Sequence, residues 1–546
     1  MNSSSTTRQT VGALLAERLA SAGVTTVFGF PGGGSNLDLI EAFADAGVRF
    51  VLTHTETGAA FMAAGQAEAT GGVGAVMVGN GPGLTSVVNG AAHADLDRVP
   101  LIVISDRYSE EEAATTGHQV LDQRALMAPL VRYGATLSAE RAADQLDAAI
   151  AAAQGPSAGP VHLDVPRTLT AERAAPAQEA PWAPLADGDV GAALDILQGA
   201  ARPVVVLGLE ANAPDVDAAD VRRLVEGAGA AVLTTYKAKG TFDERHDRWA
   251  GILTGGALER PVLDAADALL LIGVDPVELL GRPWRLDVPT AQIRRSPTRT
   301  DYFGDGAELV LGSVGAAVAA LADALGRRPG WPLDVVAELR EQALAAMRVG
   351  RVGRVGPHIP LPGWRIAETI AETLGSADVT YAVDAGAHML PATMFLRLRA
   401  PRRFSISNGL ASMGYALPAA IGAALGHRER LAVAVSGDGG MAYHLAELET
   451  AARVGARVVV VVINDASLSL IRIKQEAKGY QRFPLDFSRS DFASAAESFG
   501  AVGARVDDVD GLLAALEAAA RREKSTLIDV RTTGAEAAAT LKVVRG

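Results

Sequence analysis

Short, strongly apolar segments alternate with alanine-rich stretches along almost the whole sequence. Apolar runs of this length indicate buried strands, and the longer alanine-rich stretches indicate helices. Regular alternation of the two is typical of parallel sheets covered by helices. The pattern therefore predicts an α/β fold built on parallel sheets. The strands are expected at TTVFGF, GAVMVG, PLIVIS, PVVVLG, ALLLIG, LAVAVS and RVVVVVI.

Two stretches interrupt this alternation. Residues 168–188 are rich in Pro and Ala, and residues 351–363 are rich in Gly and Pro, so both are expected to be linkers. A chain of 546 residues is also long enough for about three domains. The predicted domains are residues 1–175, 189–345 and 364–535.

The first and third domains share a local pattern. In each, an apolar strand ends in a glycine-rich turn, GNGPG at 79–83 and GDGG at 437–440, and a second strand begins near Pro100 and near Arg457. The plainest interpretation is two related α/β units on either side of a middle one, although ordinary strand–helix–strand spacing also gives so weak a repeat.

Composition limits the classes of function. Hydrophobic residues make up 49% of the chain and charged residues 21%, as in globular proteins. A net charge of −13 argues against nucleic acid as a partner, because phosphate binding requires a basic surface. The chain has no Cys for disulfides or thiolate chemistry. Its apolar runs are too short to span a membrane, and the polar N-terminus is consistent with a cytoplasmic protein.

The motif GDGGMAYHLAELETAARVGARVVVVVIND is the strongest functional signal. Asp438 directly follows one predicted strand, and Asn464 and Asp465 follow the next. Parallel strands bring these turns to the same edge of the sheet, where ligands bind. Oxygen donors suit a hard cation such as Mg²⁺. By itself, GDG is more readily a turn whose Asp caps a helix; the second strand and its Asn-Asp pair favour a metal–diphosphate site.

The glycines of this motif fit the same interpretation. They let backbone N–H groups approach a diphosphate at the start of a helix. They are Gly437, Gly439 and Gly440.

The spacing of the motif resembles a known signature. GDG, 24 further residues and then Asn-Asn or Asn-Asp are typical of the thiamine-diphosphate enzymes related to acetolactate synthases and benzoylformate decarboxylases. The resemblance implies thiamine diphosphate and Mg²⁺ as cofactors. It places the metal ligands at Asp438, Asp465 and the backbone carbonyl of Ser467. Asp465 replaces the commoner Asn, which adds a negative charge and keeps an oxygen donor.

The first domain extends the resemblance. FGFPGGG at 28–34 and the segment 53–83, which ends in Gly-Pro-Gly, are similar to the pyrimidine-binding domain of this family. The resemblance makes Glu56 the essential carboxylate, which bonds N1′ of the aminopyrimidine and so lets the cofactor remove its own C2 proton. An acidic residue in a first helical turn is also favoured by the helix dipole alone.

Other family residues fall within the third domain. In SNGLASMGYALPAAIGA, Met413 matches the apolar wedge that bends the cofactor, and the Ala411 carbonyl matches the group that holds its 4′-amino group. In DAGAHMLPA, Gly386 and His388 resemble the Gly-x-His that contacts the diphosphate. Without the matched motif, Met413 would be interpreted as a core residue.

Two first-domain residues are expected near the reacting carbon. Gln119 in GHQVLDQ matches a family glutamine, and His118 stands where acetolactate synthases carry Phe. A single His is more often structural, so both interpretations of His118 stay open.

The middle domain resembles the family's Rossmann-like domain. Acetolactate-synthase flavin motifs are not evident in GILTGGALERPVL or GVDPVELLGRPW, which argues against bound FAD.

The family adds a C2 carbanion to a carbonyl, often loses CO₂ from a 2-oxo acid, and leaves an enamine that is protonated or attacks a second carbonyl. Pyruvate decarboxylases supply a carboxylate in the first glycine-rich loop, a His pair and a Glu after the metal motif. This chain has Gly33 and Ile471 at those places and no His pair. The resemblance therefore favours carboligation with an aldehyde or keto acceptor over simple decarboxylation.

Gly33, Leu470, Ile471 and Lys474 are expected to line the substrate pocket. Lys474 replaces the Trp with which acetolactate synthases select their second 2-oxo acid. With Arg472 it could pair with a substrate anion. Equally, Arg472, Lys474 and Lys478 could form a solvated helix face.

Other functions remain to be compared. The same family includes non-oxidative 2-oxo acid decarboxylases and acyl-CoA lyases. A silent paralogue would be expected to lack Glu56, Asp438 or Asp465. An NAD-dependent oxidoreductase needs GxGxxG before a helix, which neither GNGPGL nor VLGLEANAP supplies. The family also implies a homo-oligomer, a homodimer or homotetramer, because two chains share each cofactor.

Overall fold

The computed structural model describes residues 9–177, 187–279, 287–297, 302–303, 307–349, 361–481 and 484–546. Parts of both predicted linkers, residues 178–186 and 351–360, lie outside these ranges, as do residues 280–284 of the second flavin-motif candidate. The chain forms two compact units, residues 1–184 with 421–427, and residues 185–420 with 428–546. Each unit is described by itself.

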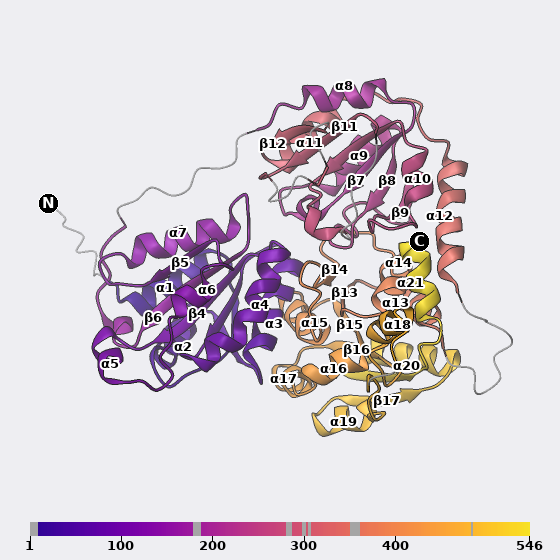
Figure 1. The fold of residues 1–546 in the computed structure, drawn as a ribbon. Coiled ribbons are helices and arrows are strands. Elements are labelled where there is room, and N and C mark those ends of the chain that lie inside the picture. The colour runs from indigo at the N-terminus through magenta and orange to yellow at the C-terminus, as the bar shows by residue number, and fades with distance from the viewer. Residues whose placement is uncertain are drawn as a thin grey trace. The chain divides into compact units, whose positions relative to one another are not determined.

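The first unit holds a parallel six-stranded sheet in the order β2-β1-β3-β4-β6-β5. Apolar residues of α1, α2 and α7 pack on one face of the sheet, and α3 and α4 cover the other (Figure 1). The strands are β1 (Thr26–Phe30), β2 (Arg49–Leu52), β3 (Gly74–Val78), β4 (Leu101–Arg107), β5 (Tyr133–Thr136) and β6 (Pro160–Pro166). The helices are α1 (Val11–Ser21), α2 (Ser35–Asp45), α3 (Glu56–Thr70), α4 (Pro82–Leu96), α5 (Glu110–Thr115), α6 (Gln123–Met127), α7 (Ala142–Gln154) and η1 (Leu169–Ala171).

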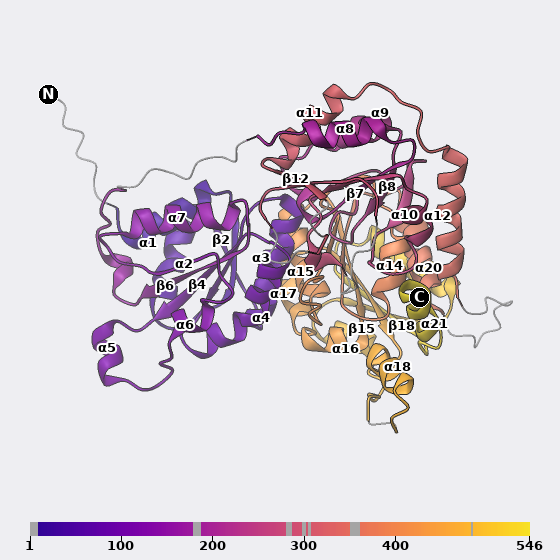
Figure 2. The ribbon, with the colours of Figure 1, turned by 45° about the horizontal axis from the view of Figure 1, so that its top comes forward.

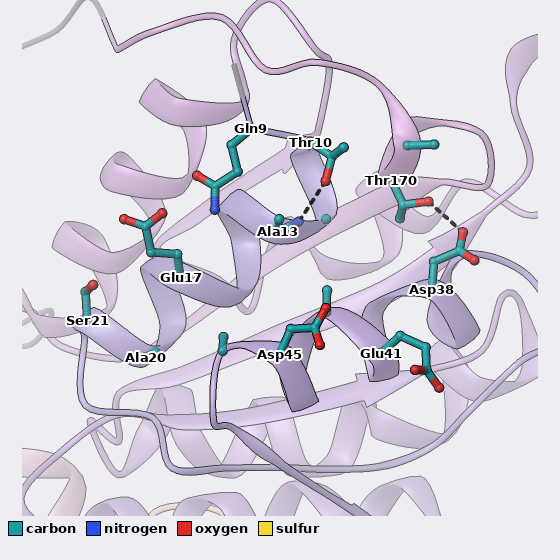
Figure 3. Close-up of a pocket in the computed structure, with 14 residues that line it drawn as sticks. Gln9, Thr10, Ala13, Glu17, Ala20, Ser21, Asp38, Glu41, Asp45 and Thr170 are labelled. Atoms are coloured by element: carbon teal, nitrogen blue, oxygen red, sulfur yellow. Dashed lines mark hydrogen bonds between the residues drawn. The ribbon is translucent and has the colours of Figure 1, made fainter. Parts of the chain in front are cut away.

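A groove of about 580 Å³ lies on the outside of this unit, between α1 and α2. Figure 3 shows Glu17, Asp38, Glu41 and Asp45 around it, with Asp38 accepting a hydrogen bond from the Thr170 hydroxyl at 2.6 Å. None of the predicted site residues lines this groove.

The middle part of the second unit contains a six-stranded parallel sheet in the order β12-β11-β10-β7-β8-β9. Its apolar residues pack with α8, α9 and α11 on one face and with α10 and α12 on the other (Figures 1 and 2). The strands are β7 (Pro203–Leu207), β8 (Ala231–Thr234), β9 (Trp249–Ile252), β10 (Ala268–Ile272), β11 (Thr290–Arg294) and β12 (Ala307–Leu311). The helices are α8 (Gly191–Gly199), η2 (Leu209–Asn212), α9 (Ala218–Ala228), α10 (Arg260–Asp264), η3 (Pro276–Glu278), α11 (Val314–Ala324) and α12 (Leu333–Met347).

The C-terminal part of the same unit forms another parallel six-stranded sheet, β14-β13-β15-β16-β18-β17. The strands are β13 (Val379–Val383), β14 (Phe404–Ile406), β15 (Leu431–Gly437), β16 (Val458–Asn464), β17 (Val502–Val506) and β18 (Thr526–Arg531). The helices are α13 (Gly363–Leu374), α14 (Met389–Phe395), α16 (Asp438–Tyr443), α17 (Glu447–Val454), α18 (Ser469–Ala477), α19 (Phe492–Ser498), α20 (Val509–Arg521) and α21 (Ala537–Arg545). The first part of α15 (Ala416–Gly426) also belongs to this unit, whereas residues 421–426 belong to the first.

A fully buried ion pair of the middle part lies against the C-terminal part of this unit. Lys239 Nζ lies 2.7 Å from Glu244 Oε2, and both side chains are inaccessible to solvent. The Glu244 carboxylate also accepts the backbone N–H of Leu398 at 2.9 Å, close to α14. This contact and a continuous apolar core make the two sheets one compact body.

The predicted architecture is confirmed: the described residues form parallel sheets covered by helices. Each of the seven apolar runs quoted above is a strand, within one or two residues at its ends. No helix among the described residues is long and apolar enough to cross a membrane.

Candidate active site

The metal motif lies at the carboxyl edge of the C-terminal sheet, where β15 and β16 are neighbours. Asp438 begins α16 and Asp465 follows β16. Asp438 Oδ2 accepts the backbone N–H of Ala466 at 2.5 Å, which joins the two turns directly. Asp465 Oδ1 accepts the N–H of Ser467 at 3.2 Å. The predicted ligand residues therefore lie together.

The two carboxylates influence each other. Burial and, to a smaller extent, the nearby negative charge of Asp465 together raise the pKa of Asp438 to about 6. Backbone N–H groups of Gly439 and Ala466 and the guanidinium of Arg489 oppose this shift. A bound cation would relieve the repulsion between the carboxylates, so the electrostatics of this edge fit a cation.

Close packing fixes the position of Asp465. Its Oδ2 accepts a hydrogen bond from the Ser469 hydroxyl on α18. A Cβ added to Gly534, which has a φ of +59°, would lie 2.3 Å from the same oxygen. Glycine is therefore needed at position 534, both for its left-handed backbone and for its small size.

Met413 lies over the start of α16. A Cβ added to Gly439 would be 3.2 Å from the Met413 methyl carbon, 3.3 Å from Leu468 and 3.6 Å from Phe487. The predicted wedge residue thus contacts the predicted diphosphate turn across a small apolar surface. Phe487 is 51% exposed, so part of this surface faces outward in the single chain.

Asp384 organises the turns around Met413, and sequence reasoning missed it. This fully buried residue follows β13 and accepts the Gly414 N–H at 2.9 and 3.0 Å and the Ser436 hydroxyl at 2.8 Å. A Cβ on Gly440 would lie 2.2 Å from Asp384 Oδ2. Burial raises the pKa of Asp384 to about 6. One carboxylate thus joins the Met413 loop to the end of β15 and to α16.

His388 lies against the same turn. A Cβ on Gly437 would be 3.2 Å from His388 Cε1, and a Cβ on Gly386, at φ +159°, would be 2.5 Å from it. Burial lowers the pKa of His388 to about 4, so the ring is neutral at neutral pH. Its Nε2 is buried and has no hydrogen-bond partner among the described residues.

Ala411 also lies in the Met413 loop. Its φ is +53°, a left-handed conformation that few non-glycine residues adopt. Such backbones persist where the surroundings enforce them, and they are frequent at ligand sites. The residue is exposed, as a carbonyl that holds a ligand would require.

The predicted pocket residues other than Gly33 lie on α18, directly after the metal motif. Ile471 is 48% exposed and Lys474 is also exposed, whereas Leu470 is half-buried. Arg472 lies 3.4 Å from Asp486. The charge of Arg472, which is half-buried, is thus already paired within the chain, and both interpretations of these cations stay predictions.

In the first unit, Glu56 is the first residue of α3. Thr55 caps the helix by accepting the Gly58 N–H at 3.0 Å. The Glu56 carboxylate points across the start of α4, since a Cβ on Gly83 would lie 3.5 Å from Glu56 Oε1. Glu56 is half-buried at the carboxyl edge of the sheet.

The first glycine-rich loop is fixed by Asp106 at the end of β4. Asp106 Oδ1 accepts the N–H and the hydroxyl of Ser35 at 3.1 and 2.8 Å, and Arg167 Nε lies 3.3 Å from Oδ2. A Cβ on Gly33, in contrast, would meet nothing within 4 Å. The loop is thus rigidly held, and Gly33 opens onto free space.

Gln119 lies beside the second glycine-rich loop. A Cβ on Gly81 would be 2.6 Å from the Gln119 carbonyl oxygen, and Gln119 itself has a φ of +60°. Gln123 Oε1 accepts the Gly81 N–H at 2.9 Å, and its Nε2 donates to the buried Asp164 at 2.7 Å. His118 is exposed. Gln123, which sequence reasoning also missed, ties the Gln119 segment to the sheet.

Models of known families match all three parts of the chain. They are the N-terminal TPP binding domain of thiamine pyrophosphate enzymes over residues 9–126, the central domain over 190–321 and the C-terminal TPP binding domain over 384–530. The chain belongs to the thiamine pyrophosphate enzymes. It is therefore a thiamine-diphosphate-dependent enzyme of carbon–carbon bond chemistry, and the predicted resemblance is confirmed.

Relatives of this thiamine pyrophosphate enzyme span nearly its whole length. It is 29% identical to an acetolactate synthase of Bacillus subtilis, over 95% of this chain and 92% of the relative. It is 30% identical to a catabolic acetolactate synthase of Raoultella terrigena, over 93% and 92%. It is 30% identical to a probable 2-ketoarginine decarboxylase of Pseudomonas aeruginosa, over 96% and 94%.

A solved structure has the same fold. The Rhodococcus jostii thiamine diphosphate-dependent 4-hydroxybenzoylformate decarboxylase superimposes with a TM-score of 0.81, covering 96% of this chain and 99% of that one at 24% identity.

The residues of the C-terminal sheet edge fit the cofactor of the family. The buried Nε2 of His388 has no partner among the described residues, and a Cβ at 437, 439 or 440 would lie within 3.2 Å of His388, Met413 or Asp384, so this turn requires small residues of the kind found where a backbone holds a diphosphate. The described residues contain no cluster of three or more His, Cys, Asp or Glu side chains suited to a metal. Two carboxylates and a carbonyl instead suit Mg²⁺, which takes its other ligands from phosphate and water.

Proposed function

We propose that the protein is a carboligase that joins a 2-oxo acid donor to an aldehyde or keto acceptor, with thiamine diphosphate and Mg²⁺ as cofactors. The proposal rests on two positions that carry no group able to donate a proton. Gly33 faces free space, and Ile471 is an exposed apolar side chain next to the metal motif. Neither can deliver a proton, so attack on a second carbonyl is favoured over protonation.

Each cofactor-binding residue has a proposed role. Asp438, Asp465 and the Ser467 carbonyl would hold Mg²⁺. Gly437, Gly439, Gly440, Gly386 and His388 would contact the diphosphate, with the neutral His388 ring able to donate one hydrogen bond.

The thiazolium and pyrimidine ends have their own residues. Met413 would support the bent cofactor, and the Ala411 carbonyl would accept a hydrogen bond from its 4′-amino group. Glu56 would hold a proton at N1′. When bound, thiamine diphosphate supplies the nucleophilic carbon that adds to a substrate carbonyl. Gln119, with His118 beside it, would orient that carbonyl.

The substrate itself would contact α18 and the first glycine-rich loop. Leu470 and Ile471 offer an apolar surface, and Lys474 offers a positive charge at its exposed end. A donor or acceptor with a second carboxylate would benefit from Lys474, whereas a substrate with a guanidinium group would be repelled. We therefore expect a substrate different from that of the probable 2-ketoarginine decarboxylase to which the chain is similar.

A product analysis tests the proposal. The holoenzyme is incubated with mono- and dicarboxylic 2-oxo acids, with and without aldehyde acceptors, and the products are identified by mass spectrometry. We expect a coupled hydroxyketone, formed fastest from a substrate with a second carboxylate. Aldehyde as the sole product in every reaction would contradict the proposal and identify a decarboxylase. Turnover only with acyl-CoA substrates would identify a lyase, and no turnover with bound cofactor would identify a silent paralogue.

The assembly and the location of the protein also stay predictions. Since the family shares each cofactor between two chains, we propose at least a homodimer. A cytoplasmic location is expected for an enzyme of 2-oxo acid metabolism.

A further inference from the structure

The sheet of the middle domain has the strand order that often creates a nucleotide site. From β7 the chain continues to β8 and β9 on one side, then crosses to β10, β11 and β12 on the other. The two halves separate between β7 and β10, which are parallel neighbours. In open parallel sheets, dinucleotides bind at this switch point, beyond the carboxyl ends of the strands.

The backbone closes this crevice in the present chain. After β7 and β10, the Gly208 N–H donates to the Ile272 carbonyl at 2.8 Å, and the Glu210 N–H donates to the Gly273 carbonyl at 2.9 Å. A Cβ on Gly208 would lie 2.3 Å from the Val274 Cα atom, so the two turns are in direct contact. A diphosphate has no space between them.

A side-chain carboxyl group accepts further hydrogen bonds from these turns. Glu278 Oε2 accepts the N–H of Leu209 at 2.8 Å and that of Asp275 at 3.2 Å, and Oε1 accepts the Thr235 hydroxyl at 2.5 Å. These groups belong to the turns after β7, β8 and β10. Backbone N–H groups of such turns are the usual ligands of a nucleotide phosphate, and here an internal carboxyl group holds them.

A buried cation beside these turns, Arg294, also has partners within the chain. Arg294, at the end of β11, lies 3.7 Å from Glu210 and 3.6 Å from Asp275, and it donates to the Val274 carbonyl at 2.6 Å. Glu210 further accepts the N–H of Arg295 at 2.9 Å. The charged side chains Glu210, Asp275, Glu278 and Arg294 are each at most 7% exposed. An added anion would meet carboxylates before it met an available positive charge.

We propose that Glu210, Asp275, Glu278 and Arg294 permanently fill the dinucleotide crevice of the middle domain, with Glu278 in the place of a nucleotide phosphate, so that the enzyme takes neither FAD nor another dinucleotide. This goes beyond the proposed carboligation, since it concerns a different domain and does not depend on the reaction.

Nucleotide binding tests the proposal directly. Protein purified with thiamine diphosphate and Mg²⁺ is examined for absorption near 450 nm and for flavin released on heating, and is then titrated calorimetrically with FAD, NAD and ADP. We expect no flavin and no saturable binding. Stoichiometric flavin, or saturable binding of any of the three, would overturn the proposal. Thiamine diphosphate binding is measured on the same sample, so a failure of the cofactor assignment is seen separately.

Hydrogen exchange tests the arrangement itself. The Leu209 amide should exchange slowly in the wild type and about 100-fold faster in Glu278→Ala, which removes its acceptor. Glu278→Gln keeps an acceptor oxygen and should preserve the protection. Thiamine diphosphate binding by both variants shows that they are folded. Fast exchange of the Leu209 amide in the wild type, or unchanged exchange in Glu278→Ala, would show that Glu278 does not occupy this position.

Discussion

At the scale of single residues, Glu56 has the clearest test. Glu56→Gln removes the carboxylate that we assign to the cofactor's N1′ atom while preserving the size of the side chain. We expect kcat to fall by about 10²- to 10⁴-fold, the usual contribution of a general acid–base group. Steady-state kinetics on the best substrate pair measures this.

The control for this variant is Glu41→Gln. Glu41 belongs to the same unit but lines the outer groove between α1 and α2. Its substitution should leave kcat within about twofold, as expected of a surface change. Equal turnover by Glu56→Gln and wild type would refute the assigned role.

The proposed metal ligands should differ in the substitutions that they tolerate. Asp465→Asn keeps an oxygen donor and removes the charge that raises the pKa of Asp438, so we expect Mg²⁺-dependent cofactor binding within about tenfold of wild type. Asp438→Ala removes a ligand and should weaken binding at least about 100-fold. Calorimetric titration with thiamine diphosphate and Mg²⁺ compares the two. Equal losses in both variants would contradict the assigned ligand set.

The sequence alone singled out residues that belong to recognisable motifs. It missed the residues whose hydrogen bonds hold the loops of those motifs in place. Asp438 and Glu56 stand out because their neighbours form a recognisable pattern. Asp384 and Gln123 do not, since each acts by accepting or donating hydrogen bonds to loops distant in the sequence. A buried polar residue at the end of a strand is interpreted locally as a turn, and only the folded chain reveals its partners.

At the scale of secondary-structure elements, the turn of Glu278 (η3) makes stability depend on pH. Burial raises the pKa of Glu278 from 4.5 to about 8. The folded state therefore keeps a proton at pH values where the unfolded state has lost it. The contribution of Glu278 to the free energy of unfolding is fully present below about pH 4.5 and is lost as the pH rises towards 8.

Glu278→Gln cannot titrate, so its stability should lack this dependence. Between pH 5 and pH 8, we expect the wild type to lose about 2 to 4 kcal/mol of unfolding free energy relative to the variant. Urea unfolding at both pH values measures the difference. Glu308→Gln, at an exposed position on β12, is the matched control and should follow the wild type. Parallel pH profiles for wild type and Glu278→Gln would contradict the raised pKa.

The strands that could be predicted are those in the sheet interiors. β16 reads VVVVVIN and is almost entirely buried, so its composition alone indicates a strand. β5, β12 and β17 lie at sheet edges and carry sequences such as YGAT and VGARV, half-buried and without a clear apolar pattern. Pairing with a neighbour defines these strands, and a single sequence does not show that pairing.

At the scale of the whole molecule, shared active sites can be tested by mixing inactive variants. Glu56→Gln and Asp438→Ala carry lesions in different units of the chain. If each site combines Glu56 of one protomer with Asp438 of another, a mixed dimer contains one intact site. Randomly reassembled dimers should then recover about a quarter of wild-type activity. Activity measured after co-refolding reports this, and no recovery would indicate that each chain forms its site alone.

The ion pair between Lys239 and Glu244 has a consequence for how the molecule responds to heat. Both residues lie between β8 and β9 of the middle part, and Glu244 accepts the Leu398 N–H of the C-terminal part, so separating the two sheets would break this hydrogen bond and divide the apolar core that they share. That cost makes partial separation unfavourable, so both sheets should melt in a single calorimetric peak whose enthalpy reflects their combined size. The middle domain then stabilises the cofactor-binding edge of the C-terminal sheet up to the temperature at which the two sheets unfold together.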